Sequence, residues 1–96
     1  MTAYVISEVE IIDQTAAAQY RALAAKSIAT YGGRYLIRAA NPEVPEGRWP
    51  EEQRVVVVEF PTMERIHEWY HSAEYARALT IRGDALERRL LFVEGV

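Results

Sequence analysis

The segment HEWYHSAEY, residues 67–75, concentrates side chains that could do chemistry. His67 and His71 are four residues apart, and on one continuous helix they would share a face, which is the spacing of a two-histidine metal site. The letters also fit the HExxH pattern of metalloproteases. These are the only histidines in the chain, so a third ligand would have to be a carboxylate. Ser72 is in addition a typical helix cap, which would end a shared face at His71. We therefore predict no metal ion here, and a metal-dependent hydrolase stays the weakest hypothesis.

Aromatic residues form the second group. Such stripes at helical spacing, turned toward a sheet, are typical of a core. The aromatic residues with this spacing are Tyr20, Tyr31, Trp69, Tyr70 and Tyr75. Tryptophan and tyrosine also line small-molecule pockets. We predict that Trp69 and Tyr70, together with His67, line such a pocket. Trp49 lies in a proline-rich loop, where it is predicted to cap the pocket or to pack on a partner protomer.

Charged residues on predicted strands form the third group. Glu8 lies in the first strand and Glu59 in the third, and these strands are neighbours in the topology derived below, so the two carboxylates are predicted to approach each other. A carboxylate in an apolar cleft has a raised pKa and can act as an acid or a base near neutral pH. Arg38 would hold such a group ionised or bind a substrate carboxylate. The alternative is that these charges are solvated or paired at strand ends.

Composition limits the classes of function. The chain has 96 residues, half of them hydrophobic, which is typical of one globular domain over residues 1–96. The net charge is −3 and the arginines are scattered, apart from the pair Arg88-Arg89, so nucleic acid is not an expected partner. There is no cysteine, no signal-peptide pattern and no apolar run of membrane-spanning length. We expect a cytoplasmic protein that does not interact with membranes.

Hydrophobic periodicity and helix signals predict the elements that must position these residues. The predicted strands span 3–11, 34–40, 54–60 and 88–96, and residues 41–53 form a long loop. One helix begins after the cap Asp13 and runs to about Tyr31. A second begins after Thr62 and is broken near Ser72, and its last piece ends at Gly83. The order is the β-α-β-β-α-β of a ferredoxin-like α+β domain, with a four-stranded antiparallel sheet and the helices on one face.

Two strands are too apolar for a monomer. Residues 55–58 are four consecutive valines, and residues 90–93 read LLFV. Successive strand residues point to opposite faces, so apolar side chains would also lie on the face away from the helices. Such a patch usually marks an interaction surface. We predict a homodimer that packs through the open sheet face, with the long loop folding over that face as the alternative.

Five segments then carry a family resemblance: YGGRYLIR (31–38), EGRW (46–49), RVVVVEFP (54–61), WYHSAEY (69–75) and LFVEGV (91–96). In order and spacing they resemble the family called domain of unknown function 1330, within the dimeric α+β barrel superfamily. The resemblance implies a ferredoxin-like protomer that pairs through its sheet. It also implies kinship with cofactor-independent monooxygenases, small isomerases and haem-handling enzymes, but supplies no catalytic residues.

The sequence therefore predicts a small-molecule-binding homodimer without a cofactor. In the enzymatic version it acts on small organic acids or ketones, with Glu8 or Glu59 as the acid/base group and Arg38 as an anion contact. The competing hypothesis is a non-catalytic interaction module whose main surface is the dimer face. A pocket lined by a buried carboxylate or histidine would favour the enzyme.

Overall fold

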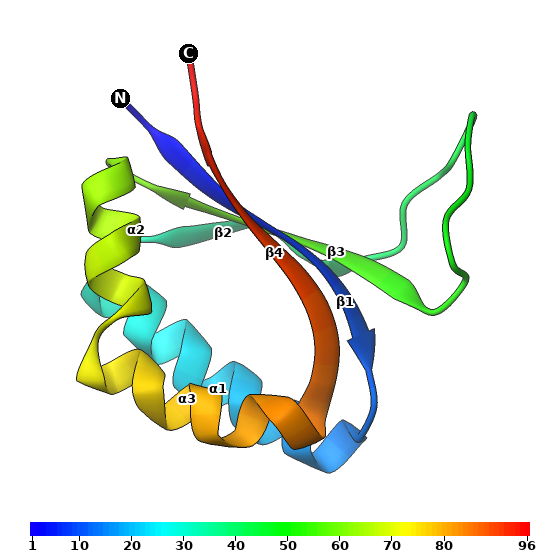
Figure 1. Ribbon diagram of the computed structural model, residues 1–96, viewed down its shortest axis with the longest axis horizontal. Coiled ribbons are helices and arrows are strands. Elements are labelled where there is room, and N and C mark those ends of the chain that lie inside the picture. The colour runs from blue at the N-terminus through cyan, green and yellow to red at the C-terminus, as the bar shows by residue number, and fades with distance from the viewer.

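The computed structural model describes residues 1–96 and contains one four-stranded antiparallel sheet with its helices on one side (Figure 1). The elements are β1 (Ala3–Ile11), α1 (Gln14–Thr30), β2 (Arg34–Ala40), β3 (Gln53–Phe60), α2 (Met63–Tyr70), α3 (Ala73–Ala85) and β4 (Leu86–Glu94). The strand order is β2-β3-β1-β4, so β1 and β3 are the central neighbours. The predicted ferredoxin-like order is confirmed. No helix has the length and apolar character that crossing a membrane requires.

Each helix begins at a side-chain cap that the sequence indicated. The Asp13 carboxylate accepts from the Ala16 amide at 2.9 Å, and the Thr62 hydroxyl accepts from the Arg65 amide at 3.1 Å. The Ser72 hydroxyl accepts from the Tyr75 amide, also at 3.1 Å. A cap of this kind satisfies one of the amides that the first turn leaves without a partner. The second helical region is therefore divided at Ser72, as predicted.

The end of α3 differs from the prediction. The helix continues through Gly83 to Ala85, and β4 begins directly at Leu86, two residues earlier than predicted. Glycine inside a helix costs only about 1 kcal/mol relative to alanine. Burial of Ala85 and Leu86 outweighs this cost, and the Ala85 carbonyl also accepts from the Ile12 and Asp13 amides at 2.9 and 3.2 Å. This junction passes from helix to strand without a loop residue.

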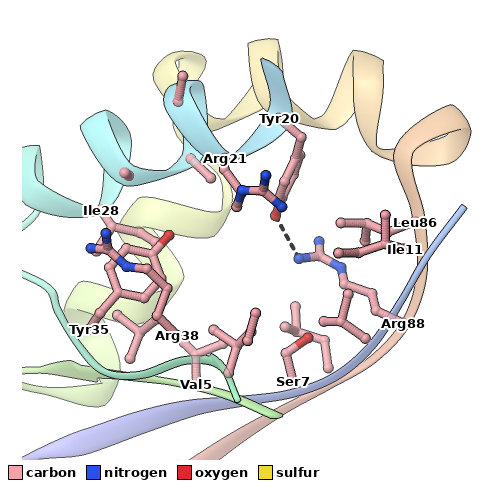
Figure 2. A pocket seen from close by; sticks show the side chains of 18 of the residues that line it. Val5, Ser7, Ile11, Tyr20, Arg21, Ile28, Tyr35, Arg38, Leu86 and Arg88 are labelled. Carbon is pink, nitrogen blue, oxygen red and sulfur yellow. Dashed lines mark hydrogen bonds between the residues drawn. The ribbon is translucent and has the colours of Figure 1, made fainter. Parts of the chain in front are cut away.

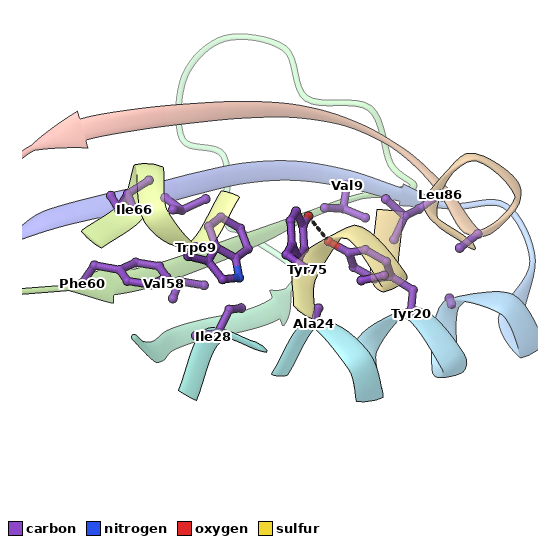
Figure 3. Close-up of a cluster of buried hydrophobic side chains, with 14 of the residues drawn as sticks. Val9, Tyr20, Ala24, Ile28, Val58, Phe60, Ile66, Trp69, Tyr75 and Leu86 are labelled. Atoms are coloured by element: carbon purple, nitrogen blue, oxygen red, sulfur yellow. Dashed lines mark hydrogen bonds between the residues drawn. The ribbon is translucent and has the colours of Figure 1, made fainter. Parts of the chain in front are cut away.

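The core lies between the helices and the sheet face that they cover (Figure 3). Alternate residues of β1 point into it, from Ala3 to Val9, because side chains of a strand alternate between its two faces. Phe60 and Trp69 pack at 5.4 Å between ring centroids, and Trp69 and Tyr75 pack at 4.2 Å. The aromatic residues of the segment 67–75 thus join α2 and α3 to the sheet.

The other sheet face has no helix over it. Its central row consists of Val57, Ile6 and Leu91, which the strand register places side by side on β3, β1 and β4. Leu91 and Val93 remain 46% and 42% exposed. Val55 and Val57 lie on this face, while Val56 and Val58 turn to the helices, as the valine run predicted.

The loop of residues 41–52 projects from one end of the sheet (Figure 1). Trp49 and Pro50 border a polar cleft beside Glu8 and Glu10, so the loop reaches one end of the open face. The apolar row in the middle of that face is not part of this cleft.

Candidate functional site

A cavity of about 350 Å³ lies between the covered sheet face and α1 (Figure 2). Fifteen of its nineteen lining residues are hydrophobic, which makes its walls suitable for a hydrocarbon group. All four strands, α1 and α2 contribute to the lining: Val5, Ser7, Val9, Ile11, Tyr20, Arg21, Ala22, Ala24, Ala25, Ile28, Tyr35, Arg38, Ala39, Val56, Val58, Trp69, Leu86, Arg88 and Leu90.

The cavity exists because small side chains face each other across it. On α1, Ala24 and Ala25 turn toward the sheet, and on β1 the floor includes Ser7. Larger residues at these positions would fill the space, since protein interiors are close-packed wherever side-chain volume permits. Val5 and Val9 lie two positions before and two positions after Ser7 on β1, and they make the rest of this floor apolar.

One polar cluster reaches into this apolar space. Arg88 of β4 donates from Nη1 to the Tyr20 hydroxyl at 2.7 Å and from Nη2 to the Tyr75 hydroxyl at 2.6 Å. The two hydroxyls also lie 2.6 Å apart, within hydrogen-bond distance of each other. We call these three residues the Arg88 cluster. It joins α1, α3 and β4, and it brings the half-buried cation of Arg88 to the wall of the cavity.

Electrostatics fix the protonation of the cluster at neutral pH. Burial raises the pKa of Tyr20 above its ordinary value, and the neighbouring Tyr75 raises it further, so Tyr20 is a neutral phenol. Burial opposes the charge of Arg88, but interactions with Tyr20 and Tyr75 outweigh this and raise the pKa of the guanidinium. Arg88 is therefore a permanent cation beside the neutral hydroxyl of Tyr20, an arrangement suited to an anion or a carbonyl oxygen.

Two further arginines line the cavity at its exposed side. Arg21 of α1 and Arg38 of β2 are both exposed, and the Arg38 guanidinium lies 4.2 Å from the centroid of the Tyr35 ring. Burial raises the pKa of Tyr35, while both arginines act in the opposite direction. No carboxylate or histidine is among the lining residues. All charged groups around the cavity are thus positive, in a chain whose net charge is −3.

A family model described as "Domain of unknown function (DUF1330)" matches residues 2–96. The chain belongs to the DUF1330 family. No curated protein sequence matches this DUF1330 chain significantly.

Solved structures share its fold. RPA0582, a protein of unknown function from Rhodopseudomonas palustris, is 17% identical, with a TM-score of 0.82 over 99% of this chain and 82% of that one. Rv0793 from Mycobacterium tuberculosis is 16% identical, with a TM-score of 0.65 over 100% and 96%. SnoaB, a cofactor-independent oxygenase from Streptomyces nogalater, is 9% identical, with a TM-score of 0.66 over 99% and 93%. The likeness to these structures is one of fold, and it agrees with the ferredoxin-like protomer that the resemblance implied.

The carboxylates predicted as acid/base groups lie on the open face of the DUF1330 protein. Glu8 pairs with Arg89 at 2.7 Å and Glu59 pairs with Arg34 at 2.8 Å. Glu59 lies opposite Tyr4 in the register, four residues along β1 from Glu8, or about 13 Å at the usual strand rise. The expectation that the two carboxylates approach each other is wrong, because strand adjacency does not determine register. Neither borders the cavity.

The predicted pocket residues divide into two groups. Trp69 and Arg38 line the cavity, and the Trp69 indole donates to the Ser27 hydroxyl at 3.0 Å. His67 and Tyr70 are not lining residues; their rings pack against Phe92 of β4, at 5.7 and 5.5 Å between centroids.

Trp49 lies away from the cavity, in the polar cleft beside Glu8, and its indole donates to the Gln53 carbonyl at 3.2 Å. No group of three or more histidine, aspartate and glutamate side chains is arranged to hold a metal ion.

Sequence reasoning missed the Arg88 cluster. Tyr20 and Tyr75 were predicted to be core residues, and they are buried, but their hydroxyls were assigned no partner. The pair Arg88-Arg89 is the sequence feature from which a buried arginine could have been predicted. In a strand, two consecutive residues face opposite sides, so one of these arginines had to point toward the helices.

Proposed function

We propose that this DUF1330 chain is a homodimeric small-molecule-binding protein whose ligand is a small organic acid or ketone. The observation that carries the proposal is the Arg88 cluster at the wall of an apolar cavity. A ligand with one anionic or carbonyl oxygen and a hydrocarbon body would match both parts.

The donors of the cluster support this class of ligand. A guanidinium has five N–H groups, and only two of those of Arg88 are used by the tyrosines. The remaining ones can donate to a carboxylate, a carbonyl or an enolate. A hydrogen bond to a charged group is stronger than one between neutral groups, and an apolar surrounding strengthens it further.

The enzymatic version of the proposal is a cofactor-independent reaction on the bound acid or ketone. The fold likeness to SnoaB makes this version worth testing. In it, the Arg88 cluster would stabilise negative charge that develops on the oxygen of the substrate. Arg38 and Trp69 would contact the substrate. Glu8 or Glu59 could supply the acid/base step only to a group that reaches the open face.

The homodimer is part of the proposal. The row of Ile6, Val57 and Leu91 on the open face supports pairing of two open faces. Ile6 and Val57 are half-buried and Leu91 is exposed, and burying their remaining apolar surface contributes about 25 cal/mol per Å². The lack of cysteine supports a cytoplasmic location. A non-catalytic dimerisation module is the alternative; the lack of a carboxylate or histidine in the cavity lining favours it.

Two adjacent arginines provide the test. Arg88→Met removes the cation of the Arg88 cluster, while Arg89→Met removes a cation of similar type on the open face. With 3-phenylpropionate as the probe, we expect Arg88→Met to weaken binding at least tenfold and Arg89→Met to change it less than twofold, measured by isothermal titration calorimetry. Absence of binding to the unmodified protein, or equal loss in both variants, would contradict the proposal and favour the dimerisation module.

A further inference from the structure

Ser7 is a buried polar residue whose hydroxyl has no partner. It lies on β1 in the floor of the cavity, is only 4% exposed, and its Oγ makes no hydrogen bond. Most buried polar atoms in proteins are hydrogen-bonded, because leaving one without a partner costs about 1–3 kcal/mol. An exception on the wall of a binding cavity requires an explanation.

The sheet around Ser7 cannot supply the partner. Its cross-strand neighbours are Val56 on β3 and Leu90 on β4, and the residues before and after it on the same face are Val5 and Val9. All four are apolar. The open direction for the hydroxyl is therefore into the cavity. In Figure 2, Ser7 lies at the floor of the cavity, below the Arg88 side chain.

Ser7 is also a close neighbour of the Arg88 cluster. Leu90 lies opposite Ser7 and Arg88 lies opposite Val9, so Ser7 and Arg88 are diagonal neighbours on the same face. The Cα atoms of such pairs are about 7–8 Å apart, and their Cβ atoms are somewhat closer. A ligand with two oxygens one or two carbons apart would span this separation with two ordinary hydrogen bonds. One oxygen would accept from the Arg88 guanidinium, and the other would accept from the Ser7 hydroxyl.

We infer that Ser7 is a specificity-determining residue that donates a hydrogen bond to a second oxygen of the ligand. The ligand class is thereby narrowed from organic acids in general to hydroxy- and oxo-carboxylic acids with an apolar body. This inference rests on the proposed binding of an acid at Arg88 and deepens it. Binding sites that provide a polar partner discriminate strongly against a ligand without the matching group, because the site group then stays unpaired.

The test compares two acids that differ at one position. Phenylpyruvate carries an oxo group beside its carboxylate, and 3-phenylpropionate lacks it. We expect the unmodified protein to bind phenylpyruvate about tenfold more tightly, and Ser7→Ala to abolish this preference while leaving the affinity for 3-phenylpropionate within twofold. Ser7→Thr retains a hydroxyl and is expected to keep most of the preference. Thermal unfolding of each variant checks that the fold is intact.

The outcomes separate this inference from the proposed function. If both acids bind equally well to the unmodified protein, or if Ser7→Ala retains the preference, the role of Ser7 is wrong. Loss of binding of both acids in Arg88→Met would in that case still support the acid site. If neither acid binds the unmodified protein, the proposed function fails and the inference fails with it.

Discussion

The two faces of the sheet use the same residue types for different purposes. On the covered face, Arg88 is half-buried, held by two phenols and directed at an apolar cavity. On the open face, Arg89 is exposed and pairs with Glu8 beside a row of aliphatic residues that no helix covers. These two arginines are adjacent in the sequence, and they lie on opposite faces of the sheet because successive side chains of a strand alternate between its faces.

The difference teaches that burial decides what a charge can do. An ion pair between exposed groups contributes about 0–1 kcal/mol, because water and salt screen it. A cation in apolar surroundings keeps its full interaction with a ligand oxygen, and here no carboxylate competes for it. A functional group is therefore expected on the covered face and an association surface on the open one. The following predictions test that division.

The largest effect is expected at the centre of the open face. Leu91→Glu places a charge beside Ile6 and Val57, at the centre of the proposed dimer interface, and we expect the proposed dimer to dissociate at least 100-fold more readily. Sedimentation velocity at micromolar concentration measures this. Ile12→Glu is the matched control, since Ile12 is 53% exposed but lies in the turn after β1. A monomeric unmodified protein would contradict the assigned role of the open face.

The covered face should make stability depend on alkaline pH. Burial raises the pKa of Tyr20 above its ordinary value near 10, so the folded state holds this proton more tightly than the unfolded state. Its contribution is complete below about pH 10 and is lost as the pH rises further, at about 1.4 kcal/mol per pH unit. We expect Tyr20→Phe to remove the contribution of one proton to the slope of the unfolding free energy against pH, measured by urea unfolding from pH 8 to 11. An unchanged slope would show that the Tyr20 proton is not protected.

The hydroxyl of Tyr75 should contribute a smaller amount at neutral pH. Tyr75→Phe removes two contacts of the cluster but leaves Tyr20 and Arg88 paired, so we expect a loss of about 1 kcal/mol in the free energy of unfolding. Tyr70→Phe is the control, because Tyr70 packs in the same aromatic group with no hydrogen bond to the cluster. Equal losses in the two variants would mean that the hydrogen bonds of Tyr75 in the Arg88 cluster contribute no more to stability than the Tyr70 hydroxyl does.

The smallest effect is expected for Glu8. Glu8→Gln removes an exposed ion pair, so its effect on unfolding should stay below about 0.5 kcal/mol and the affinity of the cavity for 3-phenylpropionate should change less than twofold. Calorimetric titration and thermal unfolding measure both. Should a turnover assay later detect activity that this variant abolishes, the acid/base role predicted for Glu8 would be supported and the division between the faces would need revision.

Local signals in the sequence were sufficient for the fold. The caps at Asp13, Thr62 and Ser72 act within one helical turn, so their neighbours in sequence are also their partners. The glycine at position 83 misled the prediction because its local cost is overcome by burial of Ala85, a contact that the sequence does not display.

The site was harder to predict because it joins distant residues. The Arg88 cluster brings together positions 20, 75 and 88, and no spacing rule connects them. The separation of Glu8 from Glu59 depends on the register between β1 and β3, which a strand pattern alone leaves open. Trp69 and Arg38 do line the cavity, but Arg38 was predicted as the partner of a strand carboxylate or as an anion contact, and not from the face that it occupies.

The direct passage from α3 into β4 has an evolutionary consequence. Because Ala85 is fixed by the amides of Ile12 and Asp13, and Leu86 already belongs to the strand, the junction has no spare residue to absorb a change in length. A single-residue insertion or deletion there would rotate every later side chain to the other face. Arg89 would then enter the cavity and Arg88 would leave it. We expect relatives of this chain to vary in the loop 41–52 and to tolerate no length change between Ala85 and Arg88.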